Sequence, residues 1–143
     1  MVRKFLGALV ALAVLGLGMV SPTDAQVQFS QCQIIATAAG VSNTSNSGVC
    51  FIDPQRMANG AGVGLLLNYS SGASATVSVQ LTGDNPVNTT GGGLWNNHDT
   101  LVSQTGSANG NIQYAVTGVR LNVSVYGSGT ITLTVIQPAL PHS

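Results

Sequence analysis

Three stretches in the second half of the chain alternate between apolar and polar residues. Residues 75–81 read ATVSVQL, residues 119–125 read VRLNVSV and residues 130–135 read TITLTV. A period of two with many β-branched residues predicts strands that bury one face and leave the other face in water. In the second stretch this pattern places every odd-numbered residue, up to Val125, on the buried face.

Weaker strand patterns lie around these three and bring the expected total to about eight short strands. They cover residues 33–38, 49–52, 64–69, 100–102 and 112–116. The glycines of residues 126–129 (YGSG) predict a hairpin between the last two strands, because glycine permits the positive φ of a tight turn. Asp53 followed by Pro54 predicts one helical turn over residues 53–58.

The number of apolar strand faces decides the fold class. One sheet of eight strands would leave many Val, Leu and Ile side chains in water, whereas two sheets packed face to face bury them. We therefore predict an all-β protein with a single β-sandwich of antiparallel strands, either jelly-roll-like or immunoglobulin-like.

The first 25 residues have the pattern of a secretory signal peptide. Arg3 and Lys4 precede an unbroken apolar run over residues 5–20, and Thr23 and Ala25 occupy the small-residue positions of a cleavage site. A spanning helix needs about 20 apolar residues, so this run favours cleavage over a membrane anchor. We expect residues 26–143 to form one domain without stable membrane insertion. We expect it in the periplasm, on the cell surface, outside the cell or in a virion.

Charge is scarce in this chain. Charged residues make up only 6% of it, and the formal net charge is zero. After the signal peptide the charged residues are Arg56, Arg120, Asp53, Asp84 and Asp99. A nucleic-acid-binding protein needs clustered Lys and Arg, so that class is excluded. A neutral surface promotes association, and we expect the partners to be further copies of the chain or a larger protein assembly.

Cys32 and Cys50 are the only cysteines. Outside the cytosol such a pair is expected to form a disulfide. Together with His98 and His142 the cysteines could supply four metal ligands, but their spacing matches no zinc motif. We therefore predict a disulfide between Cys32 and Cys50, no metal site and no cofactor.

The densest group of side chains that could bind or react is Trp95, Asn96, Asn97, His98 and Asp99. Catalysis would use His98 as a base oriented by Asp99, but adjacent side chains on a strand point to opposite faces, and no nucleophile motif accompanies them. We therefore predict that the protein is not an enzyme. The favoured interpretation is structural: the polar side chains stabilise turns, and Trp95 caps the edge of the core. The alternative is that Trp95 is exposed and binds a sugar or a protein partner.

About half of the exported domain resembles a known group of proteins. The relevant sequences are LWNNHDTL at 94–101, NIQYAV at 111–116, VRLNV at 119–123 and GTITLTVIQ at 129–137. They resemble small β-rich virion-associated structural proteins of tailed bacteriophages, which implies a structural role without catalysis. Tailed phages assemble in the cytoplasm, where neither a signal peptide nor a disulfide is expected. The resemblance therefore implies either an exported relative or a shared sandwich fold alone.

Three functions are compatible with these features. The leading hypothesis is a non-enzymatic structural or surface-interaction protein that assembles within a phage-like virion or an exported structure. The first alternative is a pilin- or adhesin-type subunit of a bacterial surface fibre, completed by a donor strand. The second alternative is a secreted carbohydrate-binding module that uses Trp95.

Overall fold

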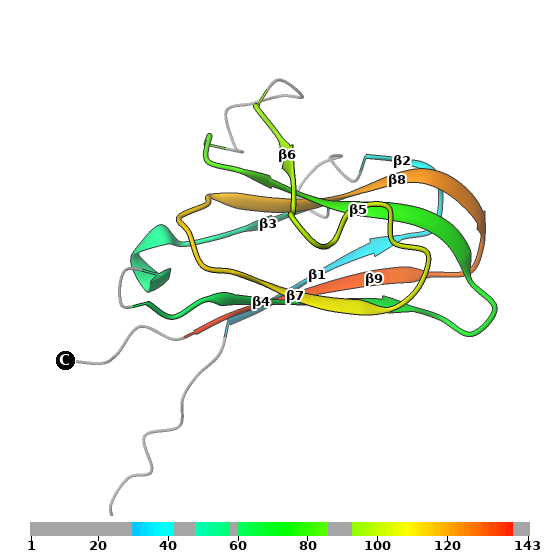
Figure 1. Ribbon diagram of the computed structural model, residues 1–143, viewed down its shortest axis with the longest axis horizontal. Coiled ribbons are helices and arrows are strands. Elements are labelled where there is room, and N and C mark those ends of the chain that lie inside the picture. The colour runs from blue at the N-terminus through cyan, green and yellow to red at the C-terminus, as the bar shows by residue number, and fades with distance from the viewer. Residues whose placement is uncertain (1–29, 42–47, 58–59, 86–92, 139–143) are drawn as a thin grey trace, which may run out of the picture.

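The protein is a β-sandwich in which two antiparallel sheets pack face to face (Figure 1). The computed structural model describes residues 30–41, 48–57, 60–85 and 93–138. The fold class expected from the alternating patterns, an all-β sandwich of about eight short strands, is therefore confirmed.

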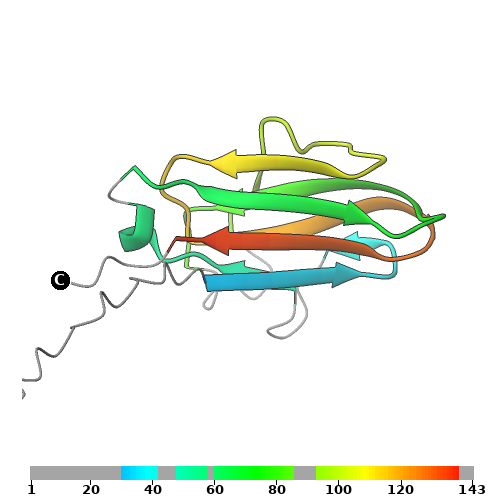
Figure 2. The same ribbon diagram turned by 90° about the horizontal axis from the view of Figure 1, so that it is seen from below.

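Sheet A has four strands among the described residues. Their spatial order is β1 (Ser30–Ala36), β9 (Ile131–Gln137), β4 (Val63–Tyr69) and β7 (Ala108–Ile112). Figure 2 looks onto this sheet, with β1 and β7 at its two rims.

Sheet B is built around its longest strand. Its members are β2 (Gly40–Val41), β3 (Val49–Phe51), β8 (Gly118–Ser128), β5 (Ser74–Thr82) and β6 (Asn96–Asn97). β5 pairs with one side of β8 and carries β6 on its other side. β2 and β3 pair one after the other along the opposite side of β8.

The core lies between the sheets, and the predicted alternation explains most of it. β5 buries Ala75, Val77, Val79 and Leu81 while the residues between them face outward. The largest fully buried side chains are Ile34, Leu65, Leu67, Leu101, Ile112, Leu121, Ile131 and Leu133. Burying each such side chain contributes about 1.5–3 kcal/mol relative to leaving it in water.

The expectation for Val125 is wrong, because β8 contains a bulge. The register shifts at Val77, so that Val77 pairs with Val123 and its neighbour Thr76 pairs with Val125. One additional residue in β8 reverses which residues face the core beyond that point. Val125 is consequently 60% exposed, and Tyr126 packs against the core in its place.

The predicted hairpin between the last two strands is also wrong. β8 belongs to sheet B and β9 to sheet A, so the chain crosses between the sheets at Gly129. A second crossing joins β4 to β5 beside it, and the two links bond to each other: the Ser70 amide donates to the Thr130 carbonyl, and the Thr130 amide donates to the Ser70 hydroxyl, each at 2.9 Å. The expected positive φ is present, since Gly129 has φ of 87°. The glycine pattern therefore located the turn but not the sheet that the next strand enters.

Three local expectations have different outcomes. Residues 100–102 are a bend instead of a strand, and β7 covers residues 108–112, so the strand expected at 112–116 starts and ends earlier. The helical turn is present as a 3-10 helix over Pro54–Met57, and the Gln55 amide donates to Asp53 Oδ1 at 3.0 Å.

Within the described ranges, no helix is long and apolar enough to cross a bilayer.

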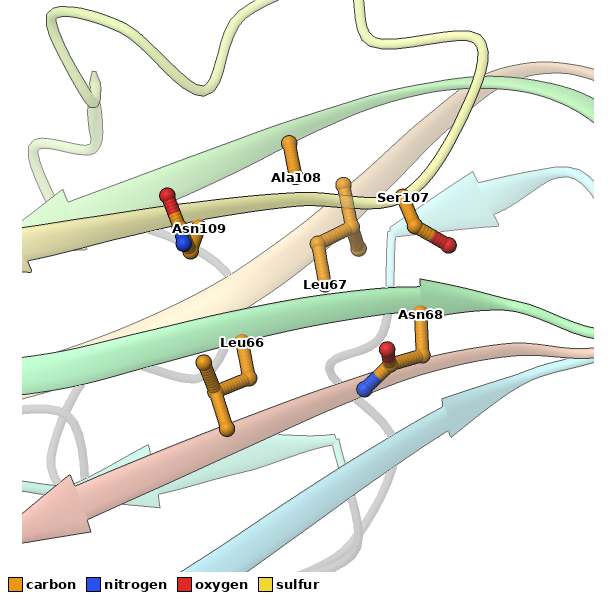
Figure 3. Close-up of a pocket in the computed structure, with 6 residues that line it drawn as sticks. All are labelled: Leu66, Leu67, Asn68, Ser107, Ala108 and Asn109. Carbon is orange, nitrogen blue, oxygen red and sulfur yellow. The ribbon is translucent and has the colours of Figure 1, made fainter.

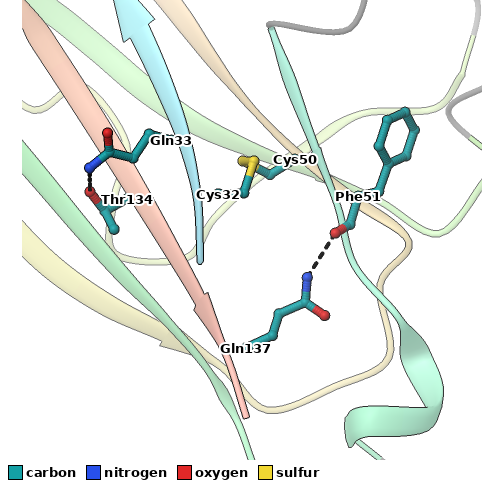
Figure 4. The surroundings of a disulfide bond; sticks show 6 residues. All are labelled: Cys32, Gln33, Cys50, Phe51, Thr134 and Gln137. Carbon is teal, nitrogen blue, oxygen red and sulfur yellow. Dashed lines mark hydrogen bonds between the residues drawn. A yellow bond between two sulfur atoms is a disulfide. The ribbon is translucent and has the colours of Figure 1, made fainter. Parts of the chain in front are cut away.

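The predicted disulfide is confirmed, and it joins the two sheets (Figure 4). Cys32 lies on β1 in sheet A and Cys50 lies on β3 in sheet B, with their Cα atoms 5.8 Å apart. Close by, the buried Gln137 side chain of β9 donates to the Phe51 carbonyl at 2.7 Å and accepts from the Asp53 amide at 3.1 Å. One covalent bond and one amide side chain therefore tie the two sheets together at the same rim.

Candidate functional site

The predicted cluster begins at the edge of sheet B, where the short strand β6 pairs with β5. Asn97 lies opposite Gln80 and Asn96 opposite Leu81. Just before β6, the Leu94 amide donates to Asp84 Oδ2 at 2.7 Å. This bond and the β6 pairing fix the backbone on both sides of Trp95.

A row of polar side chains crosses the outer face of sheet B in register. Arg120 of β8 lies opposite Gln80 of β5, which in turn lies opposite Asn97 of β6. Arg120 Nε donates to Gln80 Oε1 at 2.9 Å, and Gln80 Nε2 donates to Asn97 Oδ1 at 3.1 Å. The three side chains therefore form one continuous hydrogen-bonded row, whose members are set by strand pairing.

Trp95 completes this row. The guanidinium carbon of Arg120 lies 4.2 Å from the centroid of the Trp95 ring, which is within the range of a cation–π contact. Partial burial lowers the pKa of Arg120 from its ordinary value. Trp95 is half-buried, and its ring lies against Arg120. It is not among the described partly buried side chains that pack against the core, which are Cys32, Met57, Tyr69, Ala108 and Tyr126.

Two exposed apolar residues lie in the segments next to the row. Leu94 is 73% exposed immediately before Trp95. Phe51 of β3 is also exposed, and it lies on the same face as Val49, which is paired with Arg120. We call Trp95, Arg120, Gln80 and Asn97, together with Leu94, the Trp95 surface.

His98 is directed away from the Trp95 surface and is buried. Its Nδ1 accepts hydrogen bonds from the amides of Thr100 and Leu101, each at 3.2 Å. Its Nε2 lies 3.1 Å from the Asn111 carbonyl. A carbonyl only accepts and an amide only donates, so the proton is on Nε2 and both ring nitrogens are engaged. This geometry is that of a side chain that stabilises a turn and holds the loop after β6 against β7.

Asp99 is exposed, and its charge contributes to a raised pKa of Tyr114. Burial and, to a smaller extent, the negative charge of Asp99 raise the pKa of Tyr114. The cluster predicted from the sequence is therefore divided: Trp95 and Asn97 share the outer face, His98 points inward and Asp99 lies in the following bend. Among the described residues, no three His, Cys, Asp or Glu side chains gather into a group that could hold a metal ion.

Gln80 and Arg120 were not included in the predicted cluster, although both lie on the polar side of an alternating strand. The sequence places each residue on an outer face, but it does not show that β5 and β8 are neighbours. Their partnership with Trp95 appears only when the strand order is known.

A concave feature lies on sheet A between β4 and β7, apart from the Trp95 surface (Figure 3). This groove has a volume of about 400 Å³ and is lined by Leu66, Leu67, Asn68, Ser107, Ala108 and Asn109. It is open to solvent, and its lining contains no charged side chain. The groove therefore offers amide and hydroxyl groups together with the apolar side chain of Leu66, which is 41% exposed.

Comparison with protein-family models, with curated proteins and with solved structures finds no match to this chain in any of the three.

Proposed function

We propose that the protein is a non-enzymatic interaction module of an exported or virion-associated assembly, and that it attaches to a protein partner through the Trp95 surface. The observation that carries this proposal is the hydrogen-bonded row from Arg120 to Asn97 with Trp95 held against it. These side chains are fixed before a partner arrives, so little conformational entropy is lost on binding.

The composition of the Trp95 surface supports a protein partner. Trp and Arg are the residue types that contribute most to protein–protein affinity, and they act best beside apolar contacts that exclude water. Here Trp95 contacts Arg120, and the residue before Trp95, Leu94, is 73% exposed.

An assembly role outside the cytosol is supported by the disulfide, which is typical of exported proteins. A non-enzymatic role is supported by His98, whose two ring nitrogens are both engaged by backbone groups.

A glycan is the second candidate ligand. The amides of Gln80 and Asn97 beside Trp95 favour it, since sugars are bound by polar side chains around an aromatic ring. Arg120 covers one face of that ring at 4.2 Å, which removes part of the stacking surface a sugar would use. The geometry therefore favours a protein partner over a glycan.

The test is co-sedimentation from the producing cells with virions or surface fibres, followed by immunogold electron microscopy. We expect the wild-type protein in the particle or fibre fraction, and Trp95→Ala and Arg120→Gln in the soluble fraction. Val125→Ala is the matched control, because Val125 is exposed on the same sheet, at the other end of β8. A wild-type protein that stays soluble refutes the proposal, and Trp95-dependent binding to a glycan array would favour the sugar ligand instead.

A further inference from the structure

The sandwich leaves one long strand edge uncovered among its described residues. In the described part of the chain, β1 is the last strand of sheet A and pairs with β9 alone. In an antiparallel pair, alternate residues direct their N–H and C=O groups away from the partner. β1 therefore presents a row of backbone donors and acceptors at the rim seen in Figure 2.

The other sheet edges differ from β1 in length. In sheet B, β2 and β6 contain two residues each and β3 contains three. In sheet A, β7 is shorter, with five residues, and the loop after β6 bonds to it where His98 Nε2 donates to the Asn111 carbonyl.

β1 lacks the devices that usually prevent pairing at an edge. It reads SQCQIIA over seven residues, with no charge, no proline, no bulge and no positive φ. Proteins normally protect such an edge with lysine, proline or a bulge. Ile35 is 59% exposed on the outer face of this strand.

The disulfide makes this edge rigid. Cys32 ties the middle of β1 to β3 in the other sheet, and Gln33 donates to the Thr134 hydroxyl of β9 at 3.3 Å (Figure 4). A partner strand therefore meets an extended backbone that is already in place.

We propose that β1 pairs antiparallel with β1 of a second copy of this chain across a two-fold axis. The register that pairs the whole strand puts Gln33 opposite its own copy and Ile35 opposite Gln31 of the second copy. Because β1 carries no charge, this self-pairing brings no like charges together. The two A sheets then continue into one another. This inference extends the proposed function by naming one partner, but it uses a different surface.

The test is sedimentation velocity of the protein as the cell makes it, with its disulfide intact, over a range of concentrations. We expect a reversible dimer. Gln33→Lys and Gln33→Glu should each weaken it about tenfold or more, because two like charges lie directly opposite. An equimolar mixture of the two variants should restore the dimer. Asn68→Lys is the matched control: it puts the same charge on the exposed side of β4, in the same sheet but away from the edge.

Hydrogen exchange gives a second measurement. The outward amides of β1 should become more protected as the concentration rises, while those of β7 should not change. A wild-type protein that is monomeric at about millimolar concentration overturns the inference. So does a mixture that fails to restore the dimer, or an equal effect of Asn68→Lys. A monomer that still sediments with particles through Trp95 would overturn this inference alone, and a dimer that stays soluble in cells would overturn only the proposed function.

Discussion

Replacing His98 by alanine tests whether this ring holds the loop after β6 in place. The substitution removes the acceptor of two amides and the donor to the Asn111 carbonyl. The Leu101 amide belongs to a buried residue, whereas Thr100 and Asn111 are exposed and can bond to water. One buried donor left without a partner costs about 1–3 kcal/mol, and the space left by the ring adds to this. We expect His98→Ala to lower the free energy of unfolding by about 3 kcal/mol.

Two further variants make this prediction specific. In His98→Asn the side-chain oxygen can still accept the amide two residues on, so we expect a loss of only about 1 kcal/mol. Asp99→Asn changes an exposed neighbour and should stay within about 0.5 kcal/mol of the wild type. Urea denaturation followed by circular dichroism measures all three. If His98→Ala costs no more than Asp99→Asn, the ring does not hold the loop. If His98→Asn is as damaging as His98→Ala, the acceptor at Nδ1 is not the main contribution.

Three more outcomes follow from the structure. Gly129→Ala should cost more than about 2 kcal/mol by thermal denaturation, because φ is 87° and a Cβ there would lie 2.5 Å from the Ala73 Cα; an unchanged melting temperature would contradict the crossing at this residue. Reducing the bond between Cys32 and Cys50 should remove about 3 kcal/mol, measured by urea denaturation with and without reductant, and equal curves would argue against its role. Burial raises the pKa of Tyr69, so the folded protein holds this proton more tightly than the unfolded chain and stability should fall as the pH rises above about 10. Tyr69→Phe should reduce that slope, and an unaltered slope would refute this explanation.

The parts of the fold that the sequence predicted are those that depend on local pattern. β5 and β9 follow their alternation because each residue's face is set by its neighbours in the same strand. The prediction that Val125 is buried was wrong because the bulge in β8 arises from pairing with β5, which no pattern within β8 reveals. The prediction of a hairpin was wrong for a related reason: two glycines allow the chain to turn, but packing decides whether the next strand stays in the same sheet.

The candidate site likewise has residues that the sequence indicates and contacts that depend on strand pairing. The sequence points to Trp95 and His98 because Trp and His are rare in this chain, which has one Trp and two His. Their opposite roles depend on β6, a strand of two residues that is too short to leave a periodic signal. Arg120 was placed correctly on a solvated face, but its contact with Trp95 joins residues that are distant in sequence.

The position of the disulfide has a mechanical consequence. The first residue of β1 lies opposite the last residue of β9, as the pair Ser30 and Gln137. A force that pulls Ser30 and Gln137 apart would therefore break the β1–β9 backbone pairs one after another, beginning at this end. Breaking the pairs in sequence needs less force than breaking them all at once. Cys32 occupies the third pair, so once the first two pairs have opened, part of the tension on β1 passes through the sulfur atoms into β3. The disulfide thus adds a covalent route by which tension on the first strand reaches the other sheet.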